Sequence, residues 1–198
     1  MITFINENQS LPYRKFKELY INAIDNNQNN IDALCVSSYN EYLKQVDARY
    51  VNLKYIIDNQ WIFFTNYNSK KAQDFNSHPQ ISSLIFWDKI NTQIRIKAKI
   101  SKTNEDFSDK HYFSRTLQKN ALAWSSKQSE TIKTYDEVIK NYESALSSNI
   151  EDERPSFWGG FTFIPYYFEF WQGNDNRINK RQAFHLNDKK WKMTFLQP

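Results

Sequence analysis

Glycine is nearly absent from this chain of 198 residues. Its three glycines, Gly159, Gly160 and Gly173, lie close together near the C-terminus, and the first 158 residues contain none. Dinucleotide-binding fingerprints and Walker loops are therefore excluded there, because both use glycines to bring backbone N–H groups onto a phosphate. Glycine this rare and this clustered predicts a place where the backbone turns tightly or approaches another group closely.

Cysteine and histidine are also scarce. The single cysteine, Cys35, cannot form an internal disulfide, and its apolar neighbours favour a buried structural thiol over a nucleophile. His78, His111 and His185 are far apart and have no carboxylate or second cysteine at metal-ligand spacing. A Gly-x-Ser-x-Gly elbow is missing too. If the protein is an enzyme, we therefore expect a bound organic cofactor to carry the chemistry.

Long apolar runs are missing as well. No stretch approaches the ~20 apolar residues of a transmembrane helix, and the N-terminus has no signal-peptide core. We therefore expect a soluble, cytoplasmic protein with no membrane partner. The 26 Lys and Arg against 22 Asp and Glu leave a net charge of +4, and no nucleic-acid-binding motif is recognisable. Nucleic-acid binding is consequently the least favoured function.

The hydrophobic patterns predict a mainly β chain with helices (α+β). Closely spaced strands favour an antiparallel barrel or sandwich over βαβ units, and aromatic residues, 17% of the chain, are expected to supply much of the core. The expected helices are Pro12 to Asn26 (burying Phe16, Leu19, Tyr20, Ala23 and Ile24), one from near Ser69 to before Pro79, Glu105 to Leu117, and Ile132 to Leu146. The expected strands are Ala33 to Ser38, Asp47 to Ile57, Trp61 to Thr65, Ile81 to Trp87, Gln93 to Ile100 and Phe161 to Phe170, then a hairpin of Ala183 to Leu186 and Lys190 to Leu196.

Two segments before the glycine cluster have patterns compatible with a ligand site. The strand Arg49 to Lys54 carries a charge at each end, although an exposed sheet edge is the simpler interpretation of this segment alone. In Phe64 to Lys71 a strand leads into a helix capped by Ser69, with two lysines in the first helical turn. Cations at the start of a helix are unfavourable unless an anion compensates. The lysine pair therefore favours a phosphate site about as strongly as it favours an ordinary capped helix with surface lysines. The polar loop Ala123 to Ser129 is a weak signal.

The glycine cluster is the most informative segment. Phe157-Trp158-Gly159-Gly160 and Glu169-Phe170-Trp171-Gln172-Gly173 are followed by Arg177 and Arg181. Guanidinium groups match phosphate and carboxylate oxygens and also stack on rings. Two tryptophans and two arginines in this stretch therefore favour a site for a flat, anionic ligand over a packed tryptophan pair with surface arginines.

Taken in order, these segments resemble the pyridoxine/pyridoxamine 5′-phosphate oxidase family, FMN enzymes of the split-barrel fold. The resemblance covers nearly the whole chain and is most specific at Pro155 to Phe161 and at Glu169 to Gly173 with the two arginines. It implies one FMN-binding split-barrel domain over residues 1–198, with an N-terminal helical segment at 1–30 and a C-terminal motif region at 155–198. It also implies a homodimer in which residues of both chains bind each FMN at the interface.

The resemblance implies a role for each candidate residue. The FMN contacts are Arg49, Tyr50, Val51, Asn52, Leu53, Lys54, Phe64, Thr65, Lys70, Lys71, Gln93, Gln128, Ser129, Trp171 and Arg181. The substrate contacts are Lys54, Tyr112, Arg115, Asn120, Arg177 and Asn179, and the last two are also the catalytic candidates. The implied reaction converts pyridoxine 5′-phosphate or pyridoxamine 5′-phosphate to pyridoxal 5′-phosphate and reduces O2 to H2O2.

Several substrate-side residues depart from the family pattern. Asn179 stands where the family has a histidine and cannot titrate. The spacing from Tyr112 to Trp124 is one residue short, which makes His111 an alternative to Tyr112. Lys70 replaces an arginine and loses the bidentate fork. A split-barrel flavin oxidase with another substrate, and a non-catalytic FMN- or pyridoxal-phosphate-binding protein, therefore stay open as alternatives.

Overall fold

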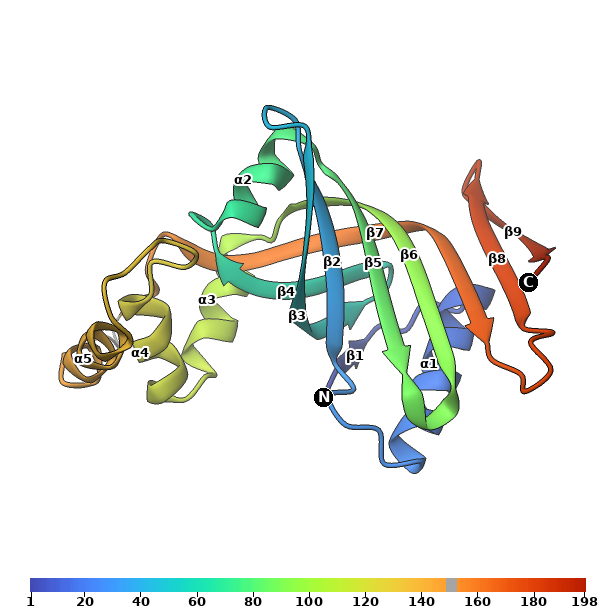
Figure 1. Cartoon of the computed structure of the whole chain (residues 1–198), viewed down its shortest axis with the longest axis horizontal. Coiled ribbons are helices and arrows are strands. Elements are labelled where there is room, and N and C mark those ends of the chain that lie inside the picture. The colour runs from blue at the N-terminus through green and yellow to red at the C-terminus, as the bar shows by residue number, and fades with distance from the viewer. Residues whose placement is uncertain (149–152) are drawn as a thin grey trace.

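A computed structural model describes residues 1–148 and 153–198, and Figure 1 shows a curved β-sheet with helices at its two ends. Within the described residues the sheet has nine strands. They are β1 (Thr3–Ile5), β2 (Ala33–Asn40), β3 (Gln45–Ile57), β4 (Gln60–Asn66), β5 (Gln80–Trp87), β6 (Thr92–Lys102), β7 (Trp158–Gln172), β8 (Lys180–Asn187) and β9 (Lys190–Leu196). The helices are α1 (Leu11–Asp25), α2 (Lys70–Ser77), α3 (Glu105–Phe113), α4 (Leu117–Ser125) and α5 (Tyr135–Leu146), with a short 3₁₀ turn, η1 (Asp88–Ile90).

The sheet closes into a barrel because one strand has two distant partners. The strands follow the order β1-β3-β2-β5-β6-β7-β8-β9, and β4 pairs with both β3 and β7. The strands β3, β2, β5, β6, β7 and β4 therefore form a ring. The pairs in this ring are antiparallel, as expected, whereas β1 adds to β3 in parallel and is too short to leave a sequence pattern.

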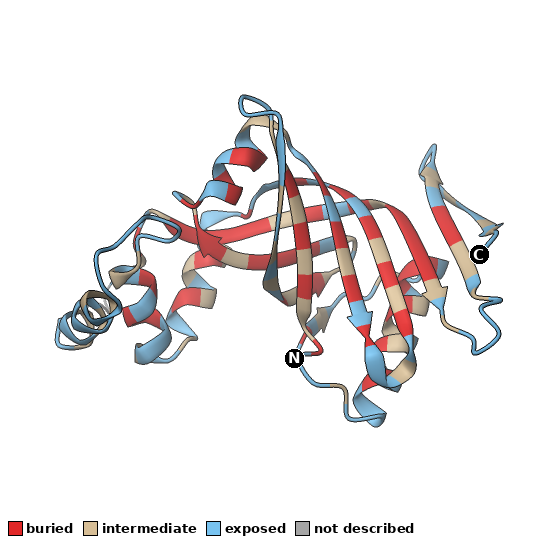
Figure 2. Ribbon diagram, viewed as in Figure 1, coloured by how far each residue is buried: buried red, intermediate tan, exposed pale blue. Residues whose placement is uncertain are grey.

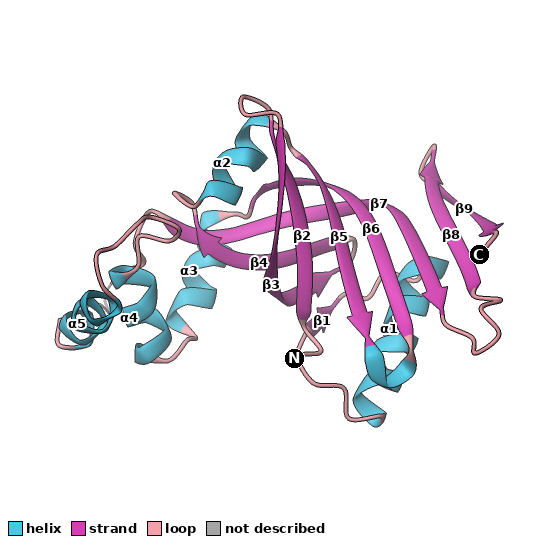
Figure 3. Cartoon of the chain, viewed as in Figure 1, coloured by secondary structure: helices cyan, strands magenta, loops and turns pink. Residues whose placement is uncertain are grey.

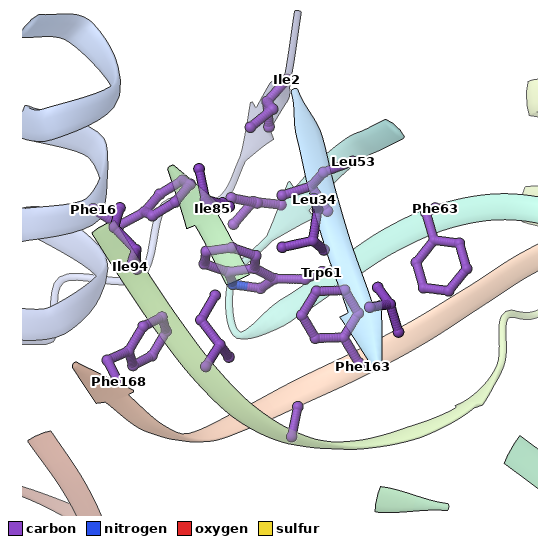
Figure 4. Close-up of a cluster of buried hydrophobic side chains, with 14 of the residues drawn as sticks. Ile2, Phe16, Leu34, Leu53, Trp61, Phe63, Ile85, Ile94, Phe163 and Phe168 are labelled. Atoms are coloured by element: carbon purple, nitrogen blue, oxygen red, sulfur yellow. The ribbon is translucent and has the colours of Figure 1, made fainter. Parts of the chain in front are cut away.

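Aromatic side chains fill the barrel, which confirms the expected aromatic core. Phe16 of α1 reaches to within 4.4 Å, between ring centroids, of Trp61, and Trp61 also packs against Phe163 and Phe168 (Figure 4). Buried and outward-facing residues alternate along β5 and β6 (Figure 2). Each wholly buried aromatic side chain contributes about 1.5–3 kcal/mol of hydrophobic free energy.

Three of the helices lie at one end of the molecule, and a hairpin lies at the other (Figure 1). Helices α3, α4 and α5 lie together at one end of the long axis, and the β8–β9 hairpin lies at the other (Figure 3). The expected hairpin is present, but its two-residue turn is Asp188-Lys189, one residue later than the expected Asn187-Asp188, and both turn residues have the positive φ that such a turn requires. None of the helices in the described part of the chain is long and apolar enough to cross a membrane.

The helix predictions need four corrections. The buried stripe of α1 contains Tyr13, Phe16, Tyr20 and Ala23, so Ile24 falls outside it and is 40% exposed. The helix expected over Glu105 to Leu117 ends at Phe113. Thr116 has an extended backbone and is the residue that immediately precedes α4. The loop expected from Ala123 consequently starts only at Ser126, after α4. Helix α5 begins at Tyr135 because Thr134 caps it, and no residue of α5 is buried.

The glycines serve close approach rather than turning. None has a positive φ, so of the two expected roles the structure shows close approach. A Cβ on Gly159 would run into the Tyr67 ring, and one on Gly160 would lie 2.6 Å from Thr103 Oγ1. The start of β7 therefore packs against the β4–α2 loop and the end of β6 without room for a methyl group.

Candidate functional site

Two adjoining cavities run along the barrel wall beside α2 and α4. The larger, of about 680 Å³, is lined by Asp47, Ala48, Arg49, Tyr50, Val51, Asn52, Phe64, Thr65, Lys70, Lys71, Leu122, Gln128 and Ser129. The smaller, of about 210 Å³, is lined by Phe64, Thr65, Asn66, Arg115, Leu122, Ala123, Ser126, Gln128 and Trp158. Four residues line both, so the two cavities form one groove of a size that suits a cofactor and a small substrate.

Positive charge collects at the α2 end of the larger cavity. Lys71 is 5% exposed, and its Nζ lies 3.2 Å from Ser69 Oγ. Burial, and then the charge of Arg49, lower the pKa of Lys71 to about 8. The Asp47 carboxylate pairs with Arg49 and Lys70, but no carboxylate of the described residues pairs with Lys71. A bound anion would relieve this cluster, so this end of the groove suits a phosphate.

Two details of this end differ from the sequence expectation. Ser69 precedes the first residue of α2, but its side chain makes no capping hydrogen bond and instead accepts from Lys71. The two lysines also differ, since Lys70 is exposed and Lys71 is buried. In the same cavity, Thr65 Oγ1 donates to Gln128 Oε1 at 3.0 Å. That bond ties β4 to the loop after α4.

A half-buried guanidinium lines the smaller cavity. The Arg115 side chain lies 4.2 Å over the Trp158 ring, and its Nη2 donates to the Lys119 carbonyl at 2.6 Å. Its Nη1 is buried and has no hydrogen-bond partner among the described residues. Burial lowers the pKa of Arg115 to about 10. A buried N–H group without an acceptor is costly, so this nitrogen suits an oxygen of a bound anion.

His111 lies beside both cavities, one helical turn before Arg115. Its ring stacks at 3.7 Å on Phe64, which lines both cavities, and its Nδ1 hydrogen-bonds to Tyr55 Oη at 2.9 Å. Burial lowers the pKa of the imidazole to about 4. The positive charges of Arg115, Lys54 and Lys119 add to this effect, so cations from β3, from α4 and from the connection between α3 and α4 converge here.

Tyr112, the expected substrate contact, points away from the groove. It is wholly buried, and its hydroxyl accepts a hydrogen bond from Trp124 Nε1 at 2.8 Å. The residue one position earlier on α3 reaches Phe64 instead, since consecutive helical residues point about 100° apart. The shortened spacing to Trp124 was the sequence signal that made His111 an alternative to Tyr112.

Three other predicted contacts near the groove are buried or already bonded to other groups of the protein. Leu53 is wholly buried in the barrel core, so only its backbone can reach a ligand. Lys54 is half-buried and pairs with Asp32 at 2.8 Å. Asn120 is buried, donates to the Tyr112 carbonyl at 3.2 Å, and has no partner in the described residues for its Oδ1.

The remaining predicted residues form a second group outside the groove. Gln93, Trp171 and Arg181 are neighbours across β6, β7 and β8. Arg177 and Asn179 lie in the loop before β8, where Asn179 Oδ1 accepts from the Asn174 N–H at 3.1 Å. The two tryptophans of the C-terminal stretch do not meet within one chain, because Trp158 and Trp171 lie near opposite ends of the long strand β7 (Figure 1).

Arg181 is held in place by a buried acid. Its Nε and Nη2 donate to Glu169 Oε1 at 3.0 and 2.7 Å, and Arg95 Nη1 and Tyr167 Oη reach Glu169 Oε2 at 3.0 and 2.9 Å. Burial opposes ionisation of Glu169, but the bonds from Arg181 and Tyr167 outweigh it and lower its pKa. Sequence reasoning missed this cluster, since Glu169 reads only as part of the Glu-Phe-Trp-Gln-Gly motif.

Family models, related sequences and solved structures all match this chain. A family model described as pyridoxamine 5′-phosphate oxidase matches residues 24–147, and one described as the pyridoxine 5′-phosphate oxidase C-terminal dimerisation region matches residues 158–198. A protein of Trichormus variabilis named pyridoxine/pyridoxamine 5′-phosphate oxidase is 34% identical over 94% of this chain and 88% of its own length. A protein of the same name from Coxiella burnetii is 30% identical over 94% and 95%.

Solved structures show the same fold. PhzG from Burkholderia lata, crystallised with tetrahydrophenazine-1-carboxylic acid, superposes with a TM-score of 0.90 at 24% identity and covers 96% of this chain and 93% of its own. A pyridoxamine 5′-phosphate oxidase-related, FMN-binding protein from Nostoc punctiforme gives a TM-score of 0.78 at 12% identity, over 96% and 99%. The expected split-barrel fold is thereby confirmed.

Proposed function

The chain belongs to the pyridoxamine 5′-phosphate oxidase family, and from this membership we propose that it is an FMN-dependent oxidase of phosphorylated B6 vitamers. The alcohol or amine carbon of pyridoxine or pyridoxamine 5′-phosphate becomes the aldehyde of pyridoxal 5′-phosphate, and O2 takes up two electrons and two protons to become H2O2. With the amine, water then releases ammonia. One observation carries the proposal: a single groove has a cation without a carboxylate partner among the described residues at each end, the buried Lys71 at one and the half-buried Arg115 at the other.

The cofactor is FMN, and the larger cavity fits it. Arg49, Lys70 and Lys71 would hold the phosphate, and Thr65 and Gln128 supply hydrogen-bonding groups along the same wall. FMN supplies the hydride acceptor that no side chain of this sequence provides, and it passes the electrons on to O2. The fit rests on the lowered pKa of Lys71 and on its lack of a carboxylate partner among the described residues.

The substrate phosphate belongs at the smaller cavity. A phosphate dianion is bound best by guanidinium and ammonium groups that hydrogen-bond to it, and Arg115, Lys54 and Lys119 supply these charges around His111. The neutral imidazole adds a hydrogen-bonding group without adding a charge. Trp158 and Leu122 line the same cavity and limit the water that reaches the reacting carbon.

The complete site requires a second copy of the chain. Gln93, Trp171, Arg177, Asn179 and Arg181 lie outside the groove, and four of the five lie in the region that matches the dimerisation model. In the proposed homodimer each copy offers this second group to the groove of its partner. Arg177 and Asn179 then approach the substrate, and Trp171 and Arg181 approach the FMN.

A second candidate is a flavin oxidase whose substrate is a ring carboxylate. The residues favour it in one respect, because Asn179 carries no charge and Arg115 is a single guanidinium with a buried, unpartnered Nη1 in the described residues, which suits a carboxylate as well as a phosphate. PhzG, which shares the fold, holds such a carboxylic acid in its solved structure.

Anaerobic flavin reduction tests both candidates. The FMN-loaded protein is mixed without oxygen with pyridoxine 5′-phosphate, pyridoxamine 5′-phosphate or a dihydroaromatic carboxylic acid, and the flavin absorbance is followed. Bleaching by a phosphorylated vitamer, with the yellow colour returning in air, supports the first candidate. Bleaching only by the carboxylic acid supports the second, and an unchanged spectrum with all three contradicts both.

A further inference from the structure

A buried carboxylate lies behind the phosphate end of the groove. Asp74 of α2 is wholly buried, and its Oδ2 and Oδ1 accept hydrogen bonds from Ser38 Oγ at 2.7 Å and from Asn40 Nδ2 at 2.8 Å. Ser38, on β2, is 2% exposed. Neither Asp74 nor Ser38 lines the cavity, so neither contacts a ligand held there.

The direction of these hydrogen bonds follows from the chemistry of the groups. A guanidinium has no acceptor, so Arg49 Nη1 donates to the Ser38 oxygen, which lies 2.7 Å away. The single hydroxyl proton of Ser38 is then donated to Asp74. The same nitrogen lies 3.2 Å from the Asp47 carbonyl and 3.4 Å from the Val36 carbonyl. Nη1 is therefore committed to the barrel wall.

The same carboxylate also fixes the second cation. Asp74 follows Lys71 by three residues, so both lie on one face of α2. The bonds to Ser38 and Asn40 fasten α2 to β2, and β2 is paired with β3, where Val36 lies opposite Arg49. Lys71 is held through the helix and Arg49 through the Ser38 hydroxyl, so the spacing of the two cations depends on one buried acid.

We propose that Asp74 and Ser38 are positioning residues that aim Arg49, and set its spacing from Lys71, for a phosphate. The inference rests on the proposed function in one respect, namely that this phosphate is the one of FMN. Riboflavin carries the same ring system without a phosphate. Loss of the positioning therefore weakens FMN binding and leaves riboflavin binding unchanged, whereas a general loss of structure weakens both.

The test measures dissociation constants for FMN and riboflavin in the full-length protein, by quenching of flavin fluorescence. The variants are Ser38→Ala and Asp74→Asn, because the two act on the same bond from opposite sides and at least one should fold. Each is expected to raise the FMN constant about tenfold, the effect of one charge-assisted hydrogen bond, and to leave riboflavin unchanged. Thermal unfolding is recorded in parallel.

Ser83→Ala is the matched control. Ser83 is also 2% exposed, lies on the neighbouring strand β5 opposite Val36, and has no hydrogen-bond partner for its Oγ in the described residues. Like Ser38→Ala, the control variant removes one buried serine hydroxyl, but this hydroxyl does not contact Arg49 or Asp74. The preference for FMN over riboflavin should therefore not change.

Two results would overturn the inference: an unchanged FMN constant in both variants, or equal weakening of FMN and riboflavin. Wild-type protein that binds both flavins equally would count against the proposed cofactor instead. Binding of inorganic phosphate then decides the positioning role. Its loss in Ser38→Ala but not in Ser83→Ala supports that role, and its retention in both variants overturns it.

Discussion

The carboxylate of Asp47 lies 3.0 Å from Nη2 of Arg49, at the phosphate end of the groove. The same carboxylate lies 3.5 Å from Nζ of Lys70. These two cations and Asp47 belong to one cavity wall, so the protein itself supplies an anion beside the position proposed for the cofactor phosphate. Asp47 is half-exposed and can turn toward solvent when another anion arrives.

Replacement of Asp47 should tighten cofactor binding. In Asp47→Asn both cations are released and the repulsion between carboxylate and phosphate disappears. The pair is partly exposed, so we expect only about a threefold fall in the dissociation constant of FMN. Titration at low and high salt is the measurement, and the gain should shrink as salt screens the charges. Weaker binding would show that Asp47 holds Arg49 in place instead.

Replacement of Arg115 should affect substrate and spare the cofactor. In Arg115→Ala the substrate phosphate loses its half-buried guanidinium, and we expect KM for pyridoxine 5′-phosphate to rise about 10- to 100-fold while FMN stays bound. Arg115→Lys keeps the charge but loses the planar fork of the guanidinium, so its KM should lie between those of the wild type and Arg115→Ala. Steady-state kinetics provide the measurement, with exposed Lys110→Ala as control. Flavin loss from Arg115→Ala would contradict the division of the groove.

Acid should destabilise the fold through His111. The pKa of this residue is lowered from 6.5 to about 4. Between these two pH values the imidazole is protonated in the unfolded chain and neutral in the folded chain. The free energy of unfolding therefore falls as the pH drops through this window. In His111→Gln the fall between pH 7 and pH 5 should be smaller, as measured by urea unfolding at both values. The same change at exposed His185 serves as control, and equal slopes in wild type and His111→Gln would disprove the effect.

A methyl group at Gly159 should be costly. In Gly159→Ala the new Cβ meets the Tyr67 ring, and overpacking of this kind costs about 1–3 kcal/mol. Chemical unfolding measures the loss. In a Tyr67→Ala background the ring is gone, so the same substitution should cost much less. An equal cost in both backgrounds would place the strain in the backbone.

A histidine at position 179 should raise turnover. Asn179 is tied to the Asn174 N–H and cannot titrate, whereas Asn179→His restores the residue type of the family. If Asn limits the reaction, kcat rises in the variant while FMN affinity stays constant. Stopped-flow reduction of the flavin separates this step from reoxidation. An unchanged reduction rate would show that the amide suffices.

The sequence predicted repeating patterns well and contacts between distant elements poorly. The alternation of Ile94, Ile96 and Ala98 was enough to place β6, because a strand with one buried face repeats every two residues. The break between α3 and α4 left no comparable pattern, since Ser114 and Thr116 are ordinary residues whose role depends on local geometry.

The candidate site divides in the same way. Arg49, Lys70 and Lys71 lie in recognisable segments, and the structure brings them to one cavity. Asp74 and Ser38 meet only because α2 packs on β2, and nothing in the sequence near either residue indicates the other. The two ends of β7 showed the opposite problem, since residues close in sequence were separated by an extended strand.

The double pairing of β4 has a consequence for how the protein is made. The segment Trp61 to Asn66 pairs with β7, so the strand that carries Phe64 and Thr65 needs a partner that emerges from the ribosome about a hundred residues later. Contacts of such large sequence separation slow folding, because a long loop must close first. We therefore expect a nascent chain to gain flavin affinity only after Phe163, the last residue that pairs with β4, has left the ribosome, so the cofactor binds late in the synthesis of each molecule.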